Sequence, residues 1–471
     1  MTSQAKNFIL SLVVAIAIVL IPSQYFPLAQ LSVIEQRVMA LFVFAAMLWV
    51  LEPIPIYATS ILIIVLELLT ISTSGINVLI DNQGDHFGEL IAYKDIMGTF
   101  ASPIILLFLG GFFLAMASTK YRLDQGLAKV LLKPFGTRPK MIMLGLMIIT
   151  AVFSMFMSNT ATTAMMLAIL APVLTCFDEK DPGRIAFALS IPFAANIGGI
   201  GTPIGTPPNA LALKYLTGEN NIGFGEWMAF GVPFVIVLLA VAWFLLLKFF
   251  PPKAEHLALE IKGKFMTSRK AIIVYVTFGL TILLWLFDFV HGMNSYTVAM
   301  IPVAVFLAFG IITKEDLKKM SWDVLWLVSG GIALGLGLEK SGLAAHLVNS
   351  IPFDQYAPVL IVAMAAILAT IMANFMSNTA TANLLLPIIT AVGVSVMSLE
   401  ALGGAKMLIL ATTLAASLGM SLPISTPPNA LAHATGMIES RHMSKVGVTL
   451  AIVGLVLIGI LMYVLNKVNF L

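Results

Sequence analysis

Long apolar stretches recur along this chain of 471 residues and limit what it can fold into. Residues 8–22, 227–247 and 446–465 are examples, and several runs are long enough, with their flanks, to cross a hydrocarbon layer of about 30 Å as helices. Lipid cannot hydrogen-bond to the backbone, so only helices or closed barrels span it, and continuous apolar runs favour helices. Only 10% of the residues are charged, compared with about 25% in soluble domains. The sequence therefore predicts an all-α polytopic membrane protein.

The few charges indicate a topology. Basic residues cluster in three loops, within residues 129–140, 253–270 and 314–319, and clustered basic loops usually lie in the cytoplasm. The polar stretch 77–95 has few basic residues and is predicted to be extracytoplasmic. We expect a multi-pass protein of the cytoplasmic membrane. The net charge of +3 without a block of like charge gives no indication of nucleic-acid binding, and the single cysteine, Cys176, cannot form an intramolecular disulfide.

An internal repeat organises the chain. The residues from Ser158 to Thr162 read Ser-Asn-Thr-Ala-Thr, and the same letters return from Ser377 to Thr381; Thr-Pro-Pro-Asn-Ala-Leu begins at Thr206 and again at Thr426. From the first Ser to the Thr before the prolines there are 48 residues in one copy and 49 in the other. Matched order and spacing predict two structural repeats, as in many secondary transporters.

These landmarks divide the chain into four segments. We expect an N-terminal helix in residues 1–32, a first repeat in 33–250, a cytoplasmic linker in 251–270 and a second repeat in 271–471. Each repeat should contain a hairpin motif, near 158–160 and 377–379, and an unwound helix, near 205–209 and 425–429. The motifs favour an inverted rather than a parallel arrangement of the repeats.

The Ser-Asn-Thr triplets are suited to holding an anion. Polar side chains inside an apolar run are costly in lipid unless they are used, and Asn amides and Thr hydroxyls supply the donors that a carboxylate needs. At a re-entrant tip, free backbone N–H groups and the helix dipole would add to the attraction. Two facing tips would suit a substrate with two anionic ends. The alternative is hydrogen bonding between neighbouring membrane helices.

The Pro-Pro motifs are suited to holding a cation. Two prolines remove two backbone donors and break a helix, and the freed carbonyl oxygens can coordinate Na⁺. The alternative is a kink that serves packing alone. Because no lysine, arginine or acid lies within either motif pair, bound Na⁺ would supply the positive charge that a dianion requires. No nucleophile–base pair, phosphate loop or cofactor motif is visible, so we expect a transporter rather than an enzyme, without an organic cofactor.

The paired triplets, the paired Thr-Pro-Pro-Asn-Ala breaks and the Leu-Glu-Pro-Ile-Pro segment at 51–55 resemble the divalent anion:sodium symporter family. The resemblance runs from about residue 33 to the C-terminus. It implies a homodimer with about 11 transmembrane helices and two re-entrant hairpins per chain, in which a transport domain moves against a scaffold domain by an elevator mechanism. It also implies sodium symport of C4-dicarboxylates such as succinate, malate or fumarate.

The resemblance carries over to individual residues. It implies substrate ligands at Asn159, Thr160, Asn378, Thr379, Thr206, Pro207, Thr426 and Pro427. It implies a first sodium site at Ser154, Ser158, Asn159 and Gly205, and a second at Ser377, Asn378 and Ser425.

One position departs from the family pattern. Ser154 lies four residues before Ser158, where its hydroxyl can reach the first sodium, but the equivalent residue of the second half is Ala373. The second site would then rest on backbone carbonyls, be weak or be absent. Dicarboxylate exchange without net sodium coupling, for example succinate against 2-oxoglutarate, therefore stays open as the alternative function.

Glu67 is an acid inside an apolar run. It would serve either as a proton relay or cation ligand, or in a helix–helix or subunit contact. Lys120 and Lys340 follow apolar segments at equivalent positions of the two repeats, where anchoring at the membrane interface is the simpler interpretation.

Overall fold

The computed structural model describes residues 2–26, 28, 31–81, 86–257 and 264–471, and within them the chain is helical, with a single isolated β-bridge between Ser72 and Ile91. Ten of the described helical segments are long and apolar enough to cross a membrane. The prediction of an all-α polytopic membrane protein is confirmed. The count of 11 crossings and the re-entrant character of the hairpins stay predictions.

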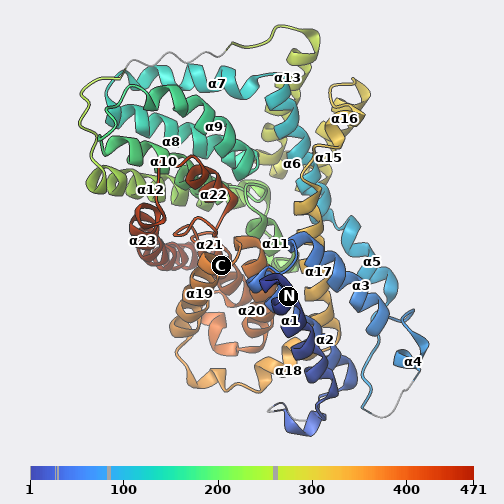
Figure 1. Cartoon of the computed structure of the whole chain (residues 1–471). Coiled ribbons are helices and arrows are strands. Elements are labelled where there is room, and N and C mark those ends of the chain that lie inside the picture. Colours follow the sequence, from blue (N-terminus) through green and yellow to red (C-terminus); the bar gives the residue numbers. More distant parts are fainter. Residues whose placement is uncertain (1, 27, 29–30, 82–85, 258–263) are drawn as a thin grey trace.

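The N-terminal part packs against α17 (Figure 1). It consists of α1 (Ser3–Leu20), α2 (Val33–Leu51), α3 (Ile56–Thr70) and the short α4 (Asn77–Ile80) and α5 (Tyr93–Gly98). Helix α2 begins with a capping box between Ser32 and Glu35, which satisfies two backbone donors at its start. It ends at Leu51, and the capping residue Glu52 is in the left-handed conformation just before Pro53, which could not continue the helix.

Two series of helices follow in the same order. The first series is α6 (Pro103–Lys120), α7 (Leu123–Leu132), α8 (Pro139–Phe156), α9 (Asn159–Leu174), α10 (Gly183–Gly199), α11 (Pro207–Tyr215) and α12 (Phe224–Phe249). The second is α17 (Trp322–Lys340), α18 (Leu343–Asn349), α19 (Pro358–Phe375), α20 (Asn378–Ser395), α21 (Gly404–Ala416), α22 (Pro427–Ala434) and α23 (Ser440–Lys467). Between the two series lie α13 (Arg269–Leu286), α14 (Asp288–His291), α15 (Ser295–Ala308) and α16 (Lys314–Leu317).

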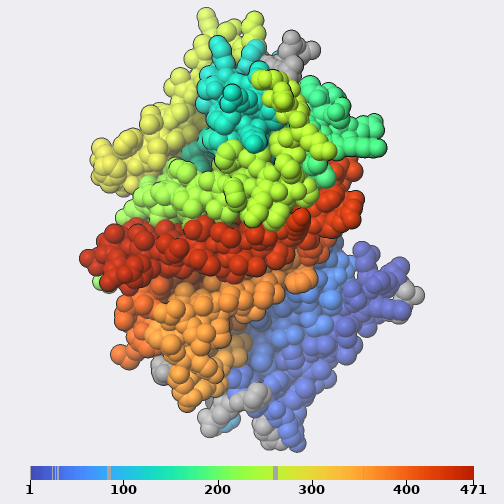
Figure 2. Space-filling model, turned by 90° about the vertical axis from the view of Figure 1, so that its left-hand side faces the viewer, coloured from blue at the N-terminus to red at the C-terminus, as the bar shows by residue number. Residues whose placement is uncertain are grey.

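Contacts between the two halves of the chain come in matching pairs. Helix α3 packs on α17 as α15 packs on α6, and α9 packs on α22 as α11 packs on α20. The last helices, α12 and α23, contact each other, and Figure 2 shows them side by side across one face of the molecule. Each series therefore completes the packing of the other, and neither buries its central helices alone.

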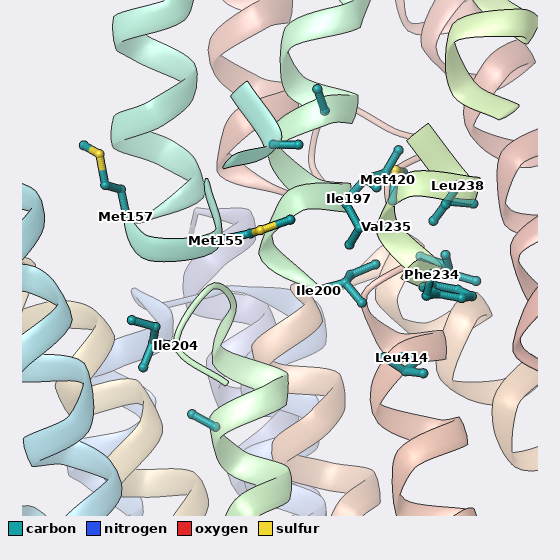
Figure 3. Packing of buried hydrophobic residues seen from close by; sticks show 14 of the residues in the cluster. Met155, Met157, Ile197, Ile200, Ile204, Phe234, Val235, Leu238, Leu414 and Met420 are labelled. Atoms are coloured by element: carbon teal, nitrogen blue, oxygen red, sulfur yellow. The ribbon is translucent and has the colours of Figure 1, made fainter. Parts of the chain in front are cut away.

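The core encloses the helices that lead to the central breaks. Helices α10 and α21 are buried along almost their whole length. Figure 3 shows Met155, Ile197 and Ile200 around the end of α10, with Phe234 and Val235 of α12 in the same cluster. Burial of this apolar surface fixes the ends of α10 and α21 at the middle of the protein.

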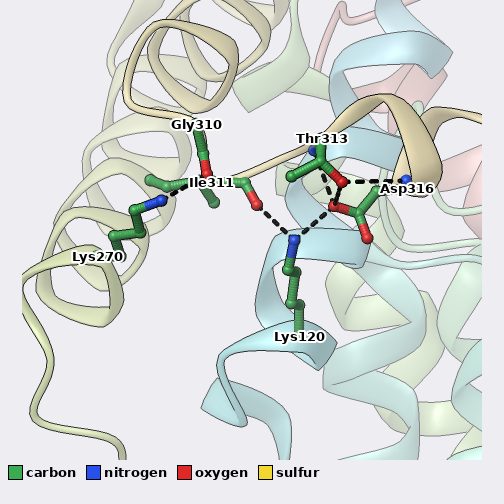
Figure 4. Close-up of polar contacts among 6 residues, drawn as sticks. All are labelled: Lys120, Lys270, Gly310, Ile311, Thr313 and Asp316. Atoms are coloured by element: carbon green, nitrogen blue, oxygen red, sulfur yellow. Dashed lines mark hydrogen bonds and ion pairs between the residues drawn. The ribbon is translucent and has the colours of Figure 1, made fainter.

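The three basic loops lie together, as the topology prediction requires. The Thr137 hydroxyl lies 3.2 Å from Nδ1 of His256, and Thr137 O accepts a 2.9 Å hydrogen bond from Leu257 N. Lys270 Nζ donates to Gly310 O at 2.8 Å, and Lys120 Nζ pairs with Asp316 at 2.5 Å (Figure 4). Part of the linker, including Lys262, lies outside the described residues. The positive-inside rule assigns this end of the molecule to the cytoplasm.

Asp316 is the most strongly held of these loop charges. Desolvation raises the pKa of its carboxyl, but hydrogen bonds from Lys120 and Thr313 outweigh that effect and bring the pKa down to about 2. The ion pair that joins the end of α6 to α16 is therefore formed at any physiological pH.

Candidate binding site

The first Ser-Asn-Thr triplet forms the turn between two helices. Helix α8 ends at Phe156 and α9 begins at Asn159, and the Ser158 hydroxyl caps α9 by accepting a 3.2 Å hydrogen bond from Ala161 N. Serine is a favoured residue at this position because its oxygen satisfies a backbone donor that the helix leaves free. Asn159 and Thr160 are therefore the first two residues of a helix, next to its positive end.

The second triplet repeats this geometry. Helix α19 ends at Phe375, α20 begins at Asn378, and the Ser377 hydroxyl accepts from Ala380 N at 3.1 Å. Both sequence-predicted hairpin motifs thus lie at helix–helix turns with an asparagine in the first turn of the second helix.

The Pro-Pro motifs start two further helices. Helix α10 ends at Gly199 and α11 begins at Pro207, and α21 ends at Ala416 and α22 begins at Pro427. Proline fits the first helical position because its missing N–H has no intrahelical acceptor there. The chain is therefore unwound between the two halves of each broken helix, and Thr206 and Thr426 are the residues just before the second halves.

All four helix starts meet at one cavity of about 170 Å³. This volume is smaller than the roughly 300–1,000 Å³ of sites for drug-sized ligands, so it suits a small molecule. Of the sequence-predicted residues, those that line it are Ser158, Asn159, Thr160, Gly205, Thr206, Pro207, Ser377, Asn378, Thr379, Ser425, Thr426 and Pro427. Ser154 is fully buried behind Asn159 instead of lining the cavity.

The cavity lining carries little charge. Asp323, near the start of α17, is the one carboxylic acid among the residues that line it, and no lysine, arginine or histidine is among them. The positive potential must come from the four converging helix N-termini. Free N–H groups are offered by the starts of α9 and α20, because α11 and α22 each begin with two prolines. Asn196 also lines the cavity, and neither it nor Asp323 was predicted as a site residue.

In the first half, a hydroxyl holds the asparagine of the tip. Ser154 Oγ lies 2.5 Å from Asn159 Oδ1 and 2.7 Å from Ala195 O. Gly199 leaves room for the asparagine, since a Cβ at that position would lie 2.7 Å from Asn159 Oδ1. Three oxygens, from Ser154, Asn159 and the α10 backbone, are thus close together, which is the kind of donor set that a hard cation prefers.

The second half uses other partners. With its amide nitrogen toward the backbone, Asn378 donates to Gly419 O at 3.1 Å and to Ala416 O at 3.2 Å. The methyl group of Ala373 packs directly against Gly419, where Ser154 has its hydroxyl in the first half. The hydroxyl that bonds to the equivalent carbonyl comes from Thr370, which donates to Ala415 O at 3.0 Å.

Asn374 adds an amide that the first half lacks. Its Oδ1 accepts from Ser421 N at 2.8 Å, and its backbone carbonyl accepts from the Ser425 hydroxyl at 2.9 Å. Ser425, a predicted ligand of the second sodium, is therefore held against the end of α19 in this half.

The asparagines after the prolines hold the breaks in shape. Asn209 Nδ2 donates to the carbonyls of Gly199, Ile200 and Thr202 at 2.8–3.1 Å, and Asn429 Nδ2 donates to those of Met420 and Leu422 at 2.8 and 3.0 Å. From the sequence we predicted that these freed carbonyls coordinate sodium. Several of them already accept a hydrogen bond from the asparagine of the same Thr-Pro-Pro-Asn motif. Carbonyls have a second lone pair, so this does not prevent a cation from binding.

One contact links the two halves across the site. Asn196 Nδ2 donates to the Thr426 hydroxyl at 3.1 Å and to Asn429 Oδ1 at 3.0 Å, so α10 is joined to the start of α22. The equivalent residue in the second half is Ala416, and the contact has no counterpart there.

Other candidates from the sequence lie elsewhere. Glu67 is buried in α3 against Gly337 of α17, and within the described chain neither carboxylate oxygen has a hydrogen-bond partner. It therefore lies at a helix–helix contact. Within the same described residues no group of three or more His, Cys, Asp or Glu side chains could hold a metal ion.

Known proteins resemble this chain in sequence and fold. A family model described as a citrate transporter matches residues 46–405. A sodium-dependent dicarboxylate transporter of Staphylococcus saprophyticus is 32% identical over 91% of this chain and 85% of that protein. An inorganic phosphate transporter of Saccharomyces cerevisiae is 31% identical over 85% of this chain, which spans 43% of that longer protein. The YdaH transporter structure of Alcanivorax borkumensis has a TM-score of 0.55, 14% identity and coverage of 79% of this chain and 87% of that one, a likeness of fold alone.

Proposed function

The chain belongs to the citrate transporter family and is a multi-pass membrane transporter rather than an enzyme, and on that premise we propose that it carries C4-dicarboxylates, such as succinate, malate or fumarate, together with sodium. The S. saprophyticus relative is named for sodium-dependent dicarboxylate transport, which supports the substrate class. The observation that carries the proposal is the cavity with four helix starts and paired Asn-Thr dipeptides.

The paired geometry suits a molecule with two anionic ends. Asn159 and Thr160 stand at the start of α9, and Asn378 and Thr379 at the start of α20, so each helix offers donors to one carboxylate. We propose these four residues, with the backbone at Thr206, Pro207, Thr426 and Pro427, as the substrate ligands. The small cavity favours a short dicarboxylate over a larger citrate.

Sodium would balance the charge of the substrate. The lining holds no basic side chain, and a unit charge at about 4 Å contributes roughly 4 kcal/mol at an intermediate dielectric. We propose one sodium site at Ser154, Ser158, Asn159 and the Gly205 backbone. A second site at Ser377, Asn378 and Ser425 would lack the hydroxyl that Ala373 replaces.

The helix order suggests how the carrier moves. If the basic loops are cytoplasmic, α2, α3, α6, the broken α10–α11 helix and α12 make five crossings before the linker, so the second half would enter in the opposite orientation. This supports inverted repeats in 33–250 and 271–471, after an N-terminal helix in 1–32 and around a linker in 251–270. By this proposal the site residues move together in a transport domain, as an elevator, within a homodimer.

Uptake into proteoliposomes tests the proposal. We expect labelled succinate to accumulate under an inward Na⁺ gradient and to accumulate little when choline replaces sodium. Uptake that is unchanged without sodium would exclude symport.

Exchange is the second candidate, and Ala373 favours it because the second cation site loses a ligand. If uptake without sodium required dicarboxylate inside the vesicles, exchange would be the function. Unsaturable flux would instead indicate a channel.

A further inference from the structure

A second cavity adjoins the candidate binding site. Its volume is about 390 Å³, and it shares Phe112 and Ser158 with the lining of the central cavity. Its other walls are the end of α6, the first turn of α9 at Ala161, and the connection from α16 to α17. The two cavities therefore meet at the tip of the α8–α9 turn.

The outer part of this second cavity is formed by the basic loops. Lys120 at the end of α6 and Lys319 after α16 both line it. Lys120 is bound to Ile311 O at 2.8 Å and to Asp316 at 2.5 Å (Figure 4). Because this loop belongs to the basic clusters, the cavity leads to the side that the positive-inside rule assigns to the cytoplasm.

Lys319 differs from Lys120 and Lys318 in its partners. Lys120 is neutralised by Asp316, and Lys318 pairs with Glu315 at 2.9 Å. Lys319 is exposed, and in the described part of the chain it has neither an ion pair nor a side-chain hydrogen bond. The cavity thus presents one uncompensated positive charge near a binding site whose own lining has no basic side chain.

We propose that this second cavity is the cytoplasmic vestibule of the binding site, and that Lys319 attracts the dianionic substrate into it. The inference rests on the proposed dicarboxylate transport and adds the side and the path of access. A fixed charge of opposite sign at the entrance of a cleft raises the local concentration of a charged ligand, and salt screens this effect. Lys319 would then change the apparent affinity from the cytoplasmic side without changing the rate at saturation.

Thiol labelling tests the path without measuring transport. In a Cys176→Ser background, Ala161→Cys places a thiol in the vestibule wall, and Thr217→Cys places one on the exposed connection between α11 and α12, which the proposed topology assigns to the other side. A membrane-impermeant maleimide should label Ala161→Cys in inside-out vesicles and Thr217→Cys in right-side-out vesicles. Labelling of Ala161→Cys from the outside only, or from neither side, would overturn the vestibule.

Transport kinetics test the role of Lys319. In inside-out vesicles at fixed Na⁺ and low ionic strength, Lys319→Gln should raise the KM for succinate by about threefold, with unchanged maximal rate, and added choline chloride should remove the difference. Lys319→Arg should behave like the wild type. The matched control, Lys318→Gln, removes a lysine that is already paired and should change little.

Two outcomes would overturn the role of Lys319: an equal effect of Lys318→Gln, or an effect that persists at high salt. If the thiols are labelled as expected but no variant and no wild-type protein moves succinate, the proposed substrate fails while the path stands.

Discussion

The two halves of the binding site have the same backbone plan and different side-chain partners. In the first half, Ser154 bridges Asn159 and Ala195 O. In the second, Ala373 fills that place, Thr370 bonds to Ala415 O, and Asn378 turns its amide nitrogen to the backbone. A side-chain hydroxyl donates to the equivalent carbonyl in both halves, Ala195 O of α10 and Ala415 O of α21. Only in the first half does that hydroxyl also reach the asparagine of the Ser-Asn-Thr triplet.

This difference separates what the fold requires from what the ligands require. Both halves keep the serine cap, the proline start and the asparagine that holds the break, because all of these stabilise backbone geometry. They differ at the position where a side-chain hydroxyl could coordinate a cation, which is Ser154 in the first half and Ala373 in the second. We infer that substrate binding is shared between the halves, whereas sodium binding is concentrated in the first.

The largest effect is expected from removing the donors that both halves share. Asn159→Ala and Asn378→Ala should each abolish measurable succinate uptake, because each removes a polar side chain that lines the cavity, and a hydrogen bond to a charged group contributes about 1.5–3 kcal/mol. Uptake into proteoliposomes and size-exclusion profiles of the purified variants are the measurements. Asn466→Ala, which removes a half-buried amide that donates to Ala401 O outside the cavity, is the control. Near-normal uptake in either site variant would remove that half from the binding site.

The next largest effect is expected on thermal stability, from replacing Asn209 and Asn429, the asparagines that follow the prolines. Asn209→Ala removes the amide that donates to Gly199 O, Ile200 O and Thr202 O, of which the last two keep Trp227 Nε1 and Gly205 N as donors. Asn429→Ala removes the donor of Met420 O and one of the two donors of Leu422 O. An unsatisfied buried polar group costs about 1–3 kcal/mol, so we expect both variants to melt several degrees lower and to transport slowly. Thermal unfolding in detergent measures this. Variants that melt like the wild type would mean that the breaks do not depend on these bonds.

Sodium dependence should distinguish the halves directly. Ser154→Ala should raise the Na⁺ concentration for half-maximal uptake by about tenfold, equivalent to about 1.4 kcal/mol of lost coupling. Thr370→Val, which removes the hydroxyl of the other half, should change it less than threefold. The comparison is made from uptake rates at graded Na⁺ and constant ionic strength. Equal shifts in the two variants would contradict a sodium site concentrated in the first half.

The smallest effect is expected from Glu67→Gln, outside the paired site. Glu67 lies in α3 against α17, away from the cavity lining. If it serves a helix–helix contact, the variant should retain the dependence of uptake on external pH, with less than a twofold change in rate. Loss of that pH dependence would instead identify a proton relay.

The sequence could predict the motifs and their positions at helix ends. Nearly every residue proposed from the paired motifs lines the one cavity, because the repeat ties each motif to a helix end. The all-helical membrane fold followed from the apolar runs, since lipid leaves the backbone few alternatives.

The contacts between the two halves of the chain could not be predicted from the sequence. Asn196 looks like one polar residue in a glycine-rich segment, and only the packing of α10 against α22 brings it to Thr426 and Asn429. The position of Asp323 at the cavity has the same cause, because α17 enters the site from a distant part of the chain. The sequence also could not show that Thr370 donates to the carbonyl equivalent to the one that Ser154 bonds, because the two hydroxyls lie on different turns of their helices.

Binding of succinate to the purified protein in Na⁺ and in choline⁺, followed by isothermal calorimetry, tests the central claim most directly. A neutral site that needs sodium to hold a dianion predicts binding at least about tenfold tighter in Na⁺, with the difference reduced in Ser154→Ala and kept in Thr370→Val. Equal affinity in the two cations would contradict the account, because the site would then hold the dianion without the charge that sodium is proposed to supply.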